Sequence, residues 1–181
     1  SWKEIQALDA GSWFGEAFAA EKVPLLRNVL RHIKGKIIPD LDFKSGDPEA
    51  LVQLLKEEGY LQEPGMATLY TGNWELANTI QTLTNGYVRV RPGAKSGYPR
   101  FDKLLEEVDP PLVNINMHEF TTGYVAAIQR ESKLAFMNCL NRGDKKKHMK
   151  RAIKAGVDYI QADKLDVLIP LVNAYNAKQQ D

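Results

Sequence analysis

The residues best suited to chemistry form a basic segment over residues 142–154, which carries seven Lys or Arg side chains and one acid, Asp144. We expect Asp144 to cap a helix that begins here. Lysines at positions 145–147 would then occupy the first helical turn, where the helix dipole disfavours each exposed cation by about 0.3–1 kcal/mol. A bound phosphate would offset this cost. The pattern therefore predicts a phosphate-binding surface formed by Arg142, Lys145, Lys146, Lys147, Lys150, Arg151 and Lys154.

A second cationic stretch, residues 86–100, contains four Lys or Arg side chains and no acid. These cations are Arg89, Arg91, Lys95 and Arg100. Tyr87 and Tyr98 flank the arginines, and aromatic rings in such a setting can stack on unpaired bases. We therefore expect this stretch to be a second contact region, with RNA or single strands favoured over duplex DNA.

Charge is divided unevenly along the chain. Residues 1–85 hold eight Lys or Arg against twelve Asp or Glu, a net −4, whereas residues 86–181 hold sixteen against eleven, a net +5. A local excess of this kind indicates an anionic partner. We predict a non-catalytic module that binds nucleic acid through its phosphate backbone. No zinc finger, RNP or basic-zipper motif assigns it a sequence preference.

Two alternatives remain open from the sequence. In the first, the chain is a protein-interaction or assembly subunit whose basic face binds an acidic protein surface, including that of a second copy in a homo-oligomer. The aromatic anchors of such an interface would be Trp2, Trp13, Phe14 and Phe18. In the second, the chain is an enzyme whose site is assembled from residues far apart in the sequence.

Motifs for catalysis, cofactors and metals are incomplete. His118 and Glu119 begin the zinc-protease pattern His-Glu-x-x-His, but Thr122 stands where the second histidine is needed. Cys139 lies among apolar residues, which indicates a buried and inert thiol. We therefore predict no catalytic residue, no cofactor and no metal site.

Composition is that of an ordinary globular protein, with 44% hydrophobic and 26% charged residues in 181. This length is sufficient for a single domain over residues 1–181, in which residues 1–60 and 118–181 could form helical subdomains. The chain has one cysteine, and no apolar run approaches the roughly 20 residues that cross a bilayer. These features favour a cytoplasmic protein without a membrane partner.

Helix signals mark much of the chain. Asp47 and Pro48 are a typical helix start, and the apolar pattern that follows closes at Gly59. Asn73 should cap a helix through Leu83. The pattern from Phe120 to Asn141 predicts one long helix, and a final helix is expected from about Lys164 to Lys178.

Strand signals are confined to the middle of the sequence, over Met66–Tyr70, Tyr87–Arg91 and Leu112–Met117. Alternation in the second of these segments predicts a half-buried strand with its two arginines on the solvent face. The connection between the last two strands is long enough for a parallel crossover, and an antiparallel pairing is also open. The expected fold is α+β and predominantly helical, with about seven helices and a small two- or three-stranded sheet in the middle.

Overall fold

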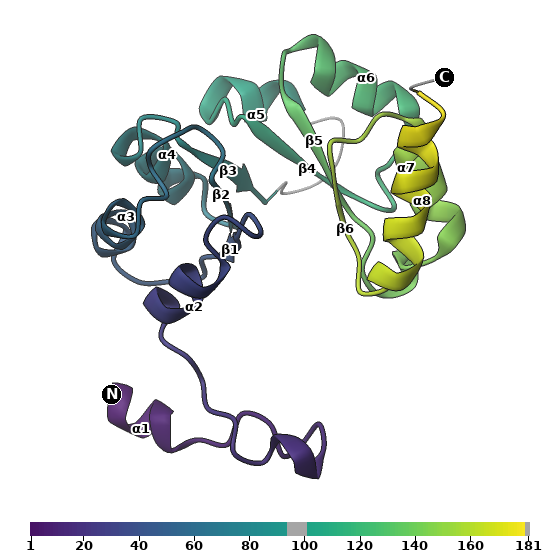
Figure 1. Ribbon diagram of the computed structural model, residues 1–181. Helices are drawn as coiled ribbons and strands as arrows, with labels where there is room; N and C mark the ends of the chain where they lie inside the picture. Colours follow the sequence, from purple (N-terminus) through teal and green to yellow (C-terminus); the bar gives the residue numbers. More distant parts are fainter. Residues whose placement is uncertain (94–100, 180–181) are drawn as a thin grey trace.

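From residue 40 onward, strands and helices alternate along the chain (Figure 1). The computed structural model describes residues 1–93 and 101–179. The strands are β1 (Asp40–Asp42), β2 (Ala67–Thr71), β3 (Val88–Pro92), β4 (Leu112–Asn116), β5 (Leu134–Asn138) and β6 (Tyr159–Gln161). The helices that follow them are α3 (Pro48–Glu57), α4 (Trp74–Leu83), α5 (Phe101–Glu107), α6 (Thr122–Arg130), α7 (Lys146–Lys154) and α8 (Leu165–Ala177). Before β1 come α1 (Trp2–Ala7), a 3-10 helix (Glu16–Phe18) and α2 (Leu26–Ile33).

All pairings between the strands are parallel. One sheet has the order β1-β2-β3 and the other β4-β5-β6, and β3 and β4 contact each other where the two sheets meet. The helices lie outside the strands and return the chain to the start of the next one (Figure 1). The predicted α+β fold with a single small central sheet is therefore wrong. The prediction omitted β1, β5 and β6, because these strands are too short for their sequence pattern to be distinguished from that of a loop or a helix.

Alternation along the strands places apolar side chains on the outer face and most of the polar side chains on the inner face, where Phe136 of β5 is an apolar exception beside Arg91. On the outer face, Leu69, Val90 and Ile115 are fully buried beneath the helices. Burial of an aliphatic side chain of this size contributes about 1.5–3 kcal/mol, so this layer is a principal source of stability. On the inner face, Tyr70 and Arg91 stand side by side in the register of β2 and β3.

The predicted solvent face of β3 is instead the interior of a curved sheet. Arg91 is only 4% exposed, so the expectation that both arginines would lie in water is wrong. Arg89 reaches across the interior, where its Nη1 donates to the hydroxyl of Tyr159 on β6 at 2.6 Å. The prediction assigned the polar residues of β3 to the correct face of the strand, but the sheet curves around this face and encloses it.

Two predicted helix starts are confirmed. The Asp47 carboxylate accepts a hydrogen bond from the backbone N–H of Glu49 at 2.9 Å at the start of α3. The Asn73 side chain accepts from the N–H of Leu76 at 3.2 Å at the start of α4. Gly59 follows α3 with a φ of +74°, a left-handed conformation that glycine adopts without strain. The two caps therefore fix where α3 and α4 begin, and Gly59 marks where the chain leaves α3.

The long helix predicted over 120–141 is wrong. α6 ends at Arg130, and a turn with Ser132 at φ +57° leads into β5. β5 contains only four consecutive apolar residues, Leu134 to Met137, and a run this short shows no periodicity that distinguishes a strand from a helix. Asp144 is also not the expected cap, because Lys145 occupies the N-cap position of α7 and Asp144 is buried, at 5% exposure.

The segment before α2 lies apart from the strands and their helices (Figure 1). Its aromatic side chains pack on one another: the ring centroids are 5.7 Å apart for Trp13 and Phe14, and 5.1 Å apart for Phe14 and Phe18. Trp13 remains 81% exposed. These side chains therefore contribute nothing to the main core.

Within the described parts of the chain, no helix has both the length and the apolar character needed to cross a membrane.

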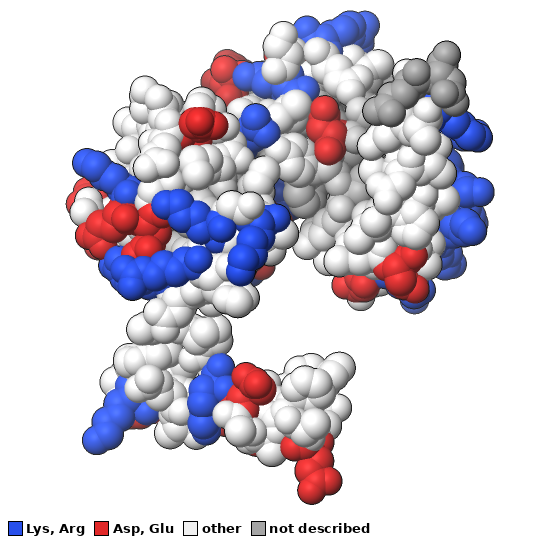
Figure 2. Space-filling model, viewed as in Figure 1, with Lys and Arg blue, Asp and Glu red and all other residues white. Residues whose placement is uncertain are grey.

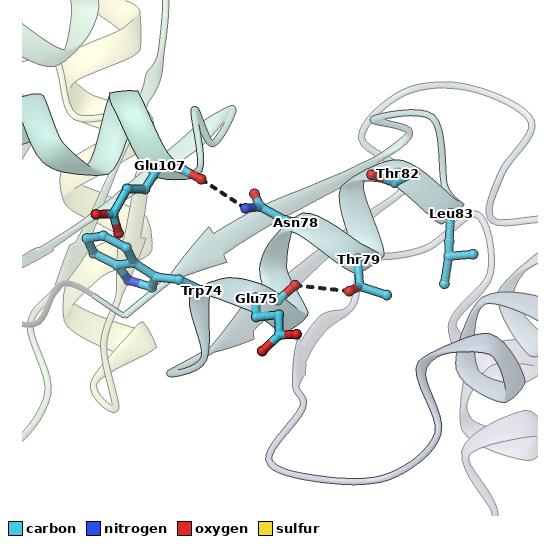
Figure 3. Close-up of a pocket in the computed structure, with 7 residues that line it drawn as sticks. All are labelled: Trp74, Glu75, Asn78, Thr79, Thr82, Leu83 and Glu107. Carbon is cyan, nitrogen blue, oxygen red and sulfur yellow. Dashed lines mark hydrogen bonds between the residues drawn. The ribbon is translucent and has the colours of Figure 1, made fainter.

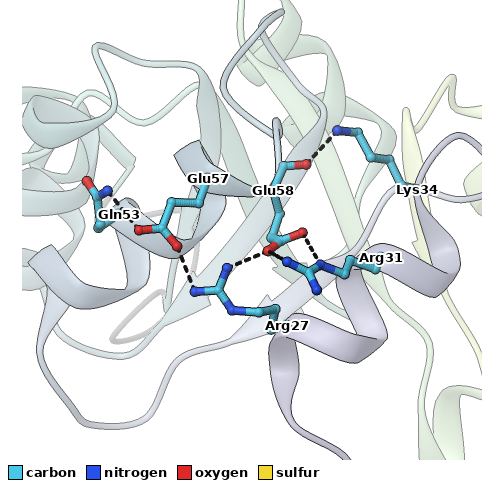
Figure 4. Close-up of polar contacts among 6 residues, drawn as sticks. All are labelled: Arg27, Arg31, Lys34, Gln53, Glu57 and Glu58. Carbon is cyan, nitrogen blue, oxygen red and sulfur yellow. Dashed lines mark hydrogen bonds and ion pairs between the residues drawn. The ribbon is translucent and has the colours of Figure 1, made fainter.

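A cluster of ion pairs attaches α2 to the end of α3 (Figure 4). The Glu58 carboxylate, 7% exposed, accepts from Nε of Arg31 at 2.7 Å and from Nη1 of Arg27 at 2.5 Å. Lys34 donates to the Glu58 backbone carbonyl at 2.6 Å. Hydrogen bonding by Arg31, with a further contribution from Arg27, holds the pKa of Glu58 below its ordinary value of 4.5 despite burial, which raises it.

Glu58→Gln is expected to weaken the dependence of stability on pH in acid. Because the pKa of Glu58 is lowered in the folded chain, its carboxylate contributes stability that is complete above pH 4.5 and is lost as the pH falls through the folded value. The drop in free energy of unfolding between pH 7 and pH 3, measured with urea, should therefore be smaller in the variant. Glu106→Gln, on the exposed side of α5, is the control. Equal drops in Glu58→Gln and the parent chain would contradict this assignment.

Candidate active site

A polar cavity of about 340 Å³ lies at the carboxyl ends of the strands. All six strands, or the residues directly after them, contribute to its lining, which comprises Asp40, Asp42, Lys44, Tyr70, Arg91, Asn114, Asn116, Asn138, Leu140 and Gln161. In parallel βα folds, ligands bind at this end of the sheet, because the last side chains of all the strands and the loops that follow them lie close together there. We refer to it as the central cavity.

Arg91 occupies the floor of the central cavity. Its Nη2 donates to Oδ2 of Asp40 at 2.7 Å, and its Nη1 donates to Oδ1 of Asn114 at 2.9 Å. The guanidinium also lies 3.6 Å from the centre of the Phe136 ring. Burial lowers the pKa of Arg91, and the Asp40 carboxylate opposes that effect. The Arg91 guanidinium thus links four strands, β1, β3, β4 and β5. Its Nε has no hydrogen-bond partner within the described residues.

Asp42 and Lys44 form a second, looser pair at the rim. The Lys44 ammonium lies 2.8 Å from Oδ1 of Asp42, and the two side chains are 70% and 60% exposed. The same ammonium lies 5.0 Å from the centre of the Tyr70 ring. Exposed pairs of this kind contribute little to stability, at most about 1 kcal/mol. The pair can therefore open at small cost, which offers a ligand both a cation and a carboxylate.

Gly93 allows the Tyr70 side chain to sit where it does. A Cβ at position 93 would lie 2.9 Å from the Tyr70 hydroxyl and 3.3 Å from the backbone of Gly72. The carbonyl of Gly93 accepts a hydrogen bond from Nε1 of Trp74 at 2.9 Å, which fixes the end of β3 to the start of α4. The close approach of the loops after β2 and β3 thus depends on a glycine.

The carboxylates of the central cavity do not make a complete metal site. Asp40 and Asp42 are hard oxygen donors of the type that Mg²⁺ and Ca²⁺ prefer. However, Asp40 is bound to Arg91, and the described residues contain no group of three or more His, Cys, Asp or Glu side chains able to hold a metal ion. The prediction that folding needs no metal is not tested by this arrangement and stays a prediction.

The basic surface predicted from the sequence is divided by the fold. Its larger part follows α7 on the outside of the molecule, where Lys and Arg side chains gather at the right edge of Figure 2. The residues concerned are exposed: Arg142, Lys145, Lys146, Lys147, Lys150, Arg151 and Lys154. Arg89 and Arg91 face the interior instead, and Tyr87 is half-buried. Lys95, Tyr98 and Arg100 lie outside the described residues. Among the described residues, the two predicted contact regions therefore do not form one surface.

A further depression, of about 650 Å³, lies on the outer side of α4 (Figure 3). Its polar groups serve the packing of neighbouring helices. Nδ2 of Asn78 donates to the backbone carbonyl of Glu107 at 2.9 Å, which joins α4 to the end of α5, and the Thr79 hydroxyl donates to the carbonyl of Glu75 in the same helix. This depression lies on the helix layer, away from the strand ends. Its polar groups make contacts within and between helices, and we therefore do not take it as the active site.

Parallel strands that are each followed by an outer helix, and that surround a polar cavity at their carboxyl ends, define a TIM-barrel-like protein. The described residues supply six such strands, and within them no strand pairs with the outer edge of β1 or of β6. No family model matches the sequence.

Comparison with known proteins gives consistent relatives. A glycerophosphodiester phosphodiesterase of Caldanaerobacter subterraneus subsp. tengcongensis is 29% identical over 94% of this chain and 70% of its own length. A phosphodiesterase of Oleispira antarctica, solved in complex with the product sn-glycerol-3-phosphate, superimposes with a TM-score of 0.79 at 17% identity, over 96% of this chain and 70% of that one. A glycerophosphodiester phosphodiesterase of Agrobacterium tumefaciens str. C58 gives 0.76 at 20% identity, over 94% and 71%. The solved structures establish the fold of this chain.

These relatives contradict the function predicted from the sequence. They are named as catalysts that act on small diesters, whereas the prediction was a non-catalytic module that binds RNA or other nucleic acid. The predicted partners, a nucleic acid, an acidic protein surface or a second copy of the chain, are wrong for the same reason. The remaining alternative, an enzyme with a site assembled from distant residues, agrees better with the relatives and with the central cavity.

The sequence reading missed most of the cavity residues, namely Asp40, Asp42, Lys44, Tyr70, Asn114, Asn116, Asn138 and Gln161. A usable signal was present. Polar residues recur at the ends of short apolar runs. Lys44 ends the segment that begins with Ile37 and Ile38, and Asn116 and Asn138 end the runs of β4 and β5. In a chain of parallel strands, such endings meet at one edge.

Proposed function

We propose that this chain is a phosphodiesterase that cleaves small glycerophosphodiesters at the central cavity. The observation that supports this most directly is the placement of the Asp42–Lys44 pair at the carboxyl end of β1. It occurs in a chain that resembles a glycerophosphodiester phosphodiesterase over 94% of its length. The proposed activity is hydrolysis of one P–O ester bond, with sn-glycerol-3-phosphate and an alcohol as products.

The residues of the central cavity fit the demands of that reaction. A phosphodiester carries one negative charge, and the exposed Lys44 ammonium can leave Asp42 to bind it. The Asp42 carboxylate, once released, can accept the proton of the attacking water or return a proton to the leaving oxygen. Arg91 acts as a positioning residue, because it holds Asp40 and Asn114 beneath the rim. No step of this proposal passes through a metal ion.

The purified protein is expected to release sn-glycerol-3-phosphate from a glycerophosphodiester, followed with a coupled enzymatic assay in buffers containing Mg²⁺, Ca²⁺ or a chelator. Lys44→Ala should raise KM by about tenfold, since it removes one charge-assisted contact with the phosphate. Lys44→Arg, which keeps the charge, should recover part of the loss. Absence of product in all three buffers, at enzyme concentrations comparable to that of the substrate, would contradict the proposed function.

The cellular setting stays a prediction from the sequence. We propose a cytoplasmic, reducing location on the basis of the single cysteine. Cys139 is fully buried, and burial raises the pKa of its thiol to about 11, so it has the low reactivity expected of a packing residue.

A further inference from the structure

A second polar cavity, of about 660 Å³, adjoins the central cavity along the ends of β4 and β5. The two cavities share Asn116, Asn138 and Leu140. The remaining lining of the second cavity, which we call the side pocket, consists of Met117, His118, Asn141, Arg142, Gly143 and His148. A diester whose phosphate lies at the Asp42–Lys44 pair would extend one of its two alcohol groups past these shared residues toward the side pocket.

The hydrogen bonds around the side pocket leave both donors and acceptors for a ligand. Asn116 gives an Nδ2 hydrogen to Glu119 at 3.0 Å, which keeps its Oδ1 as an acceptor. Asn138 accepts from the N–H of Leu140 at 3.0 Å through Oδ1, which keeps its Nδ2 as a donor. A hydroxyl group both donates and accepts, so a polyol can satisfy this mixed set.

His148 adds a ring nitrogen to the side pocket. Its Nδ1 lies 3.1 Å from the backbone carbonyl of Gly143. Since a carbonyl can only accept, Nδ1 donates in this contact, which leaves Nε2 as the ring nitrogen that a ligand hydroxyl group can contact. The Arg142 guanidinium supplies up to five donors on the same lining.

The charge of the side pocket disfavours a cationic group. Of the described residues that line it, none is Asp or Glu, and none has a Phe, Tyr or Trp ring that could hold a quaternary ammonium by cation–π contact. Glu119 and Asp144 lie close in sequence to the lining but do not belong to it: Glu119 accepts from Asn116, and Asp144 is buried, with Oδ2 3.8 Å from the Lys164 ammonium and Oδ1 without a hydrogen-bond partner in the described residues. Arg142 would repel an ammonium and attract a hydroxyl-rich or anionic group.

We propose that the side pocket binds the leaving alcohol of the substrate and selects a hydroxyl-rich, uncharged or anionic alcohol over an amino alcohol. This inference rests on the proposed function, because it takes the phosphate to lie in the central cavity. Arg142 is the specificity-determining residue, with Asn138 and His148 as hydrogen-bonding partners for the hydroxyl groups.

The test compares sn-glycero-3-phosphoinositol with sn-glycero-3-phosphocholine, both in kcat/KM and in Kd measured by calorimetry. We expect the inositol diester to be preferred by at least tenfold in the parent chain. Arg142→Glu should reduce that preference about tenfold or more, the size of one charge-assisted hydrogen bond. Lys154→Glu makes the same charge change at the far end of α7 and should leave the preference unchanged.

The two measurements separate the inference from the proposed function. Turnover of both diesters with equal kcat/KM, or a preference for the choline diester, would overturn the side-pocket assignment and leave the phosphodiesterase intact. Selective binding of the inositol diester without turnover would overturn the proposed reaction and support the assignment. An Arg142→Glu variant with an unchanged preference would also overturn the assignment, as would the absence of binding to either diester.

Discussion

Replacing Asp42 with asparagine is expected to lower kcat/KM for a glycerophosphodiester by at least 100-fold. The carboxylate at the rim of the central cavity is the group we assign to proton transfer, and loss of a general acid or base reduces rates by roughly 10²–10⁴-fold. Asparagine keeps the size and the hydrogen-bonding oxygen, so the effect isolates the ionisable group. Initial rates of sn-glycerol-3-phosphate release over a range of substrate concentrations measure it.

Stability should not change with this substitution. The Asp42 side chain is 60% exposed and its partner Lys44 is 70% exposed, so the free energy of unfolding should stay within about 0.5 kcal/mol of the parent value. Glu131→Gln, after the end of α6 on an exposed site, is a matched loss of one carboxylate and should keep full activity. A variant with asparagine at position 42 that turns over substrate at the parent rate would remove Asp42 from the mechanism.

Asp40→Ala is expected to lower the free energy of unfolding by about 2 kcal/mol, a larger effect than loss of its neighbour two residues later. Arg91 is 4% exposed, and without the Asp40 carboxylate it would be a buried cation with only Asn114 as a hydrogen-bond partner. Breaking a fully buried ion pair from one side costs roughly 3–5 kcal/mol, but the Asp40 side chain is 35% exposed, so solvent already screens this pair and the expected loss is smaller. Urea unfolding followed by circular dichroism provides the measurement.

A double variant tests the cause of this loss. Replacing both partners of a buried pair with apolar groups is often neutral, so Asp40→Ala combined with Arg91→Met should recover most of the stability lost by the single substitution. Asp42→Ala is the matched control at the rim, with an expected loss of about 0.5 kcal/mol or less. If Asp40→Ala cost no more than Asp42→Ala, the Asp40–Arg91 pair would have no role in holding the strands together.

Elements with strong local signals could be predicted from the sequence. α3 and α4 begin at side chains that cap their first turns, and β2, β3 and β4 match the predicted strands to within one residue at each end. These signals are local, because a cap or a period-two alternation depends on residues within one turn or one strand. The predicted helix at the carboxyl end is confirmed by α8, and its signal was the helical spacing of apolar residues.

What the sequence reading missed depends on contacts between distant segments. β1 and β6 have three residues each, too few to show a period, and β5 is a short apolar run that could continue a helix. Apolar and polar residues alternate around Arg91, a pattern that also fits a strand with one solvent-exposed face. Only the curvature of the sheet shows that the polar face is enclosed. The site pairs residues separated by 51 positions, Asp40 and Arg91, a link that no local pattern contains.

The lengths of the strands bear on how the molecule behaves at high concentration. β1 and β6 have free outer edges in the described residues, and exposed edges of sheets are templates for pairing with other chains. Both have three residues, whereas the four inner strands have five. Such short margins limit the length of edge with which another chain could pair, and the strand lengths therefore oppose edge-to-edge aggregation.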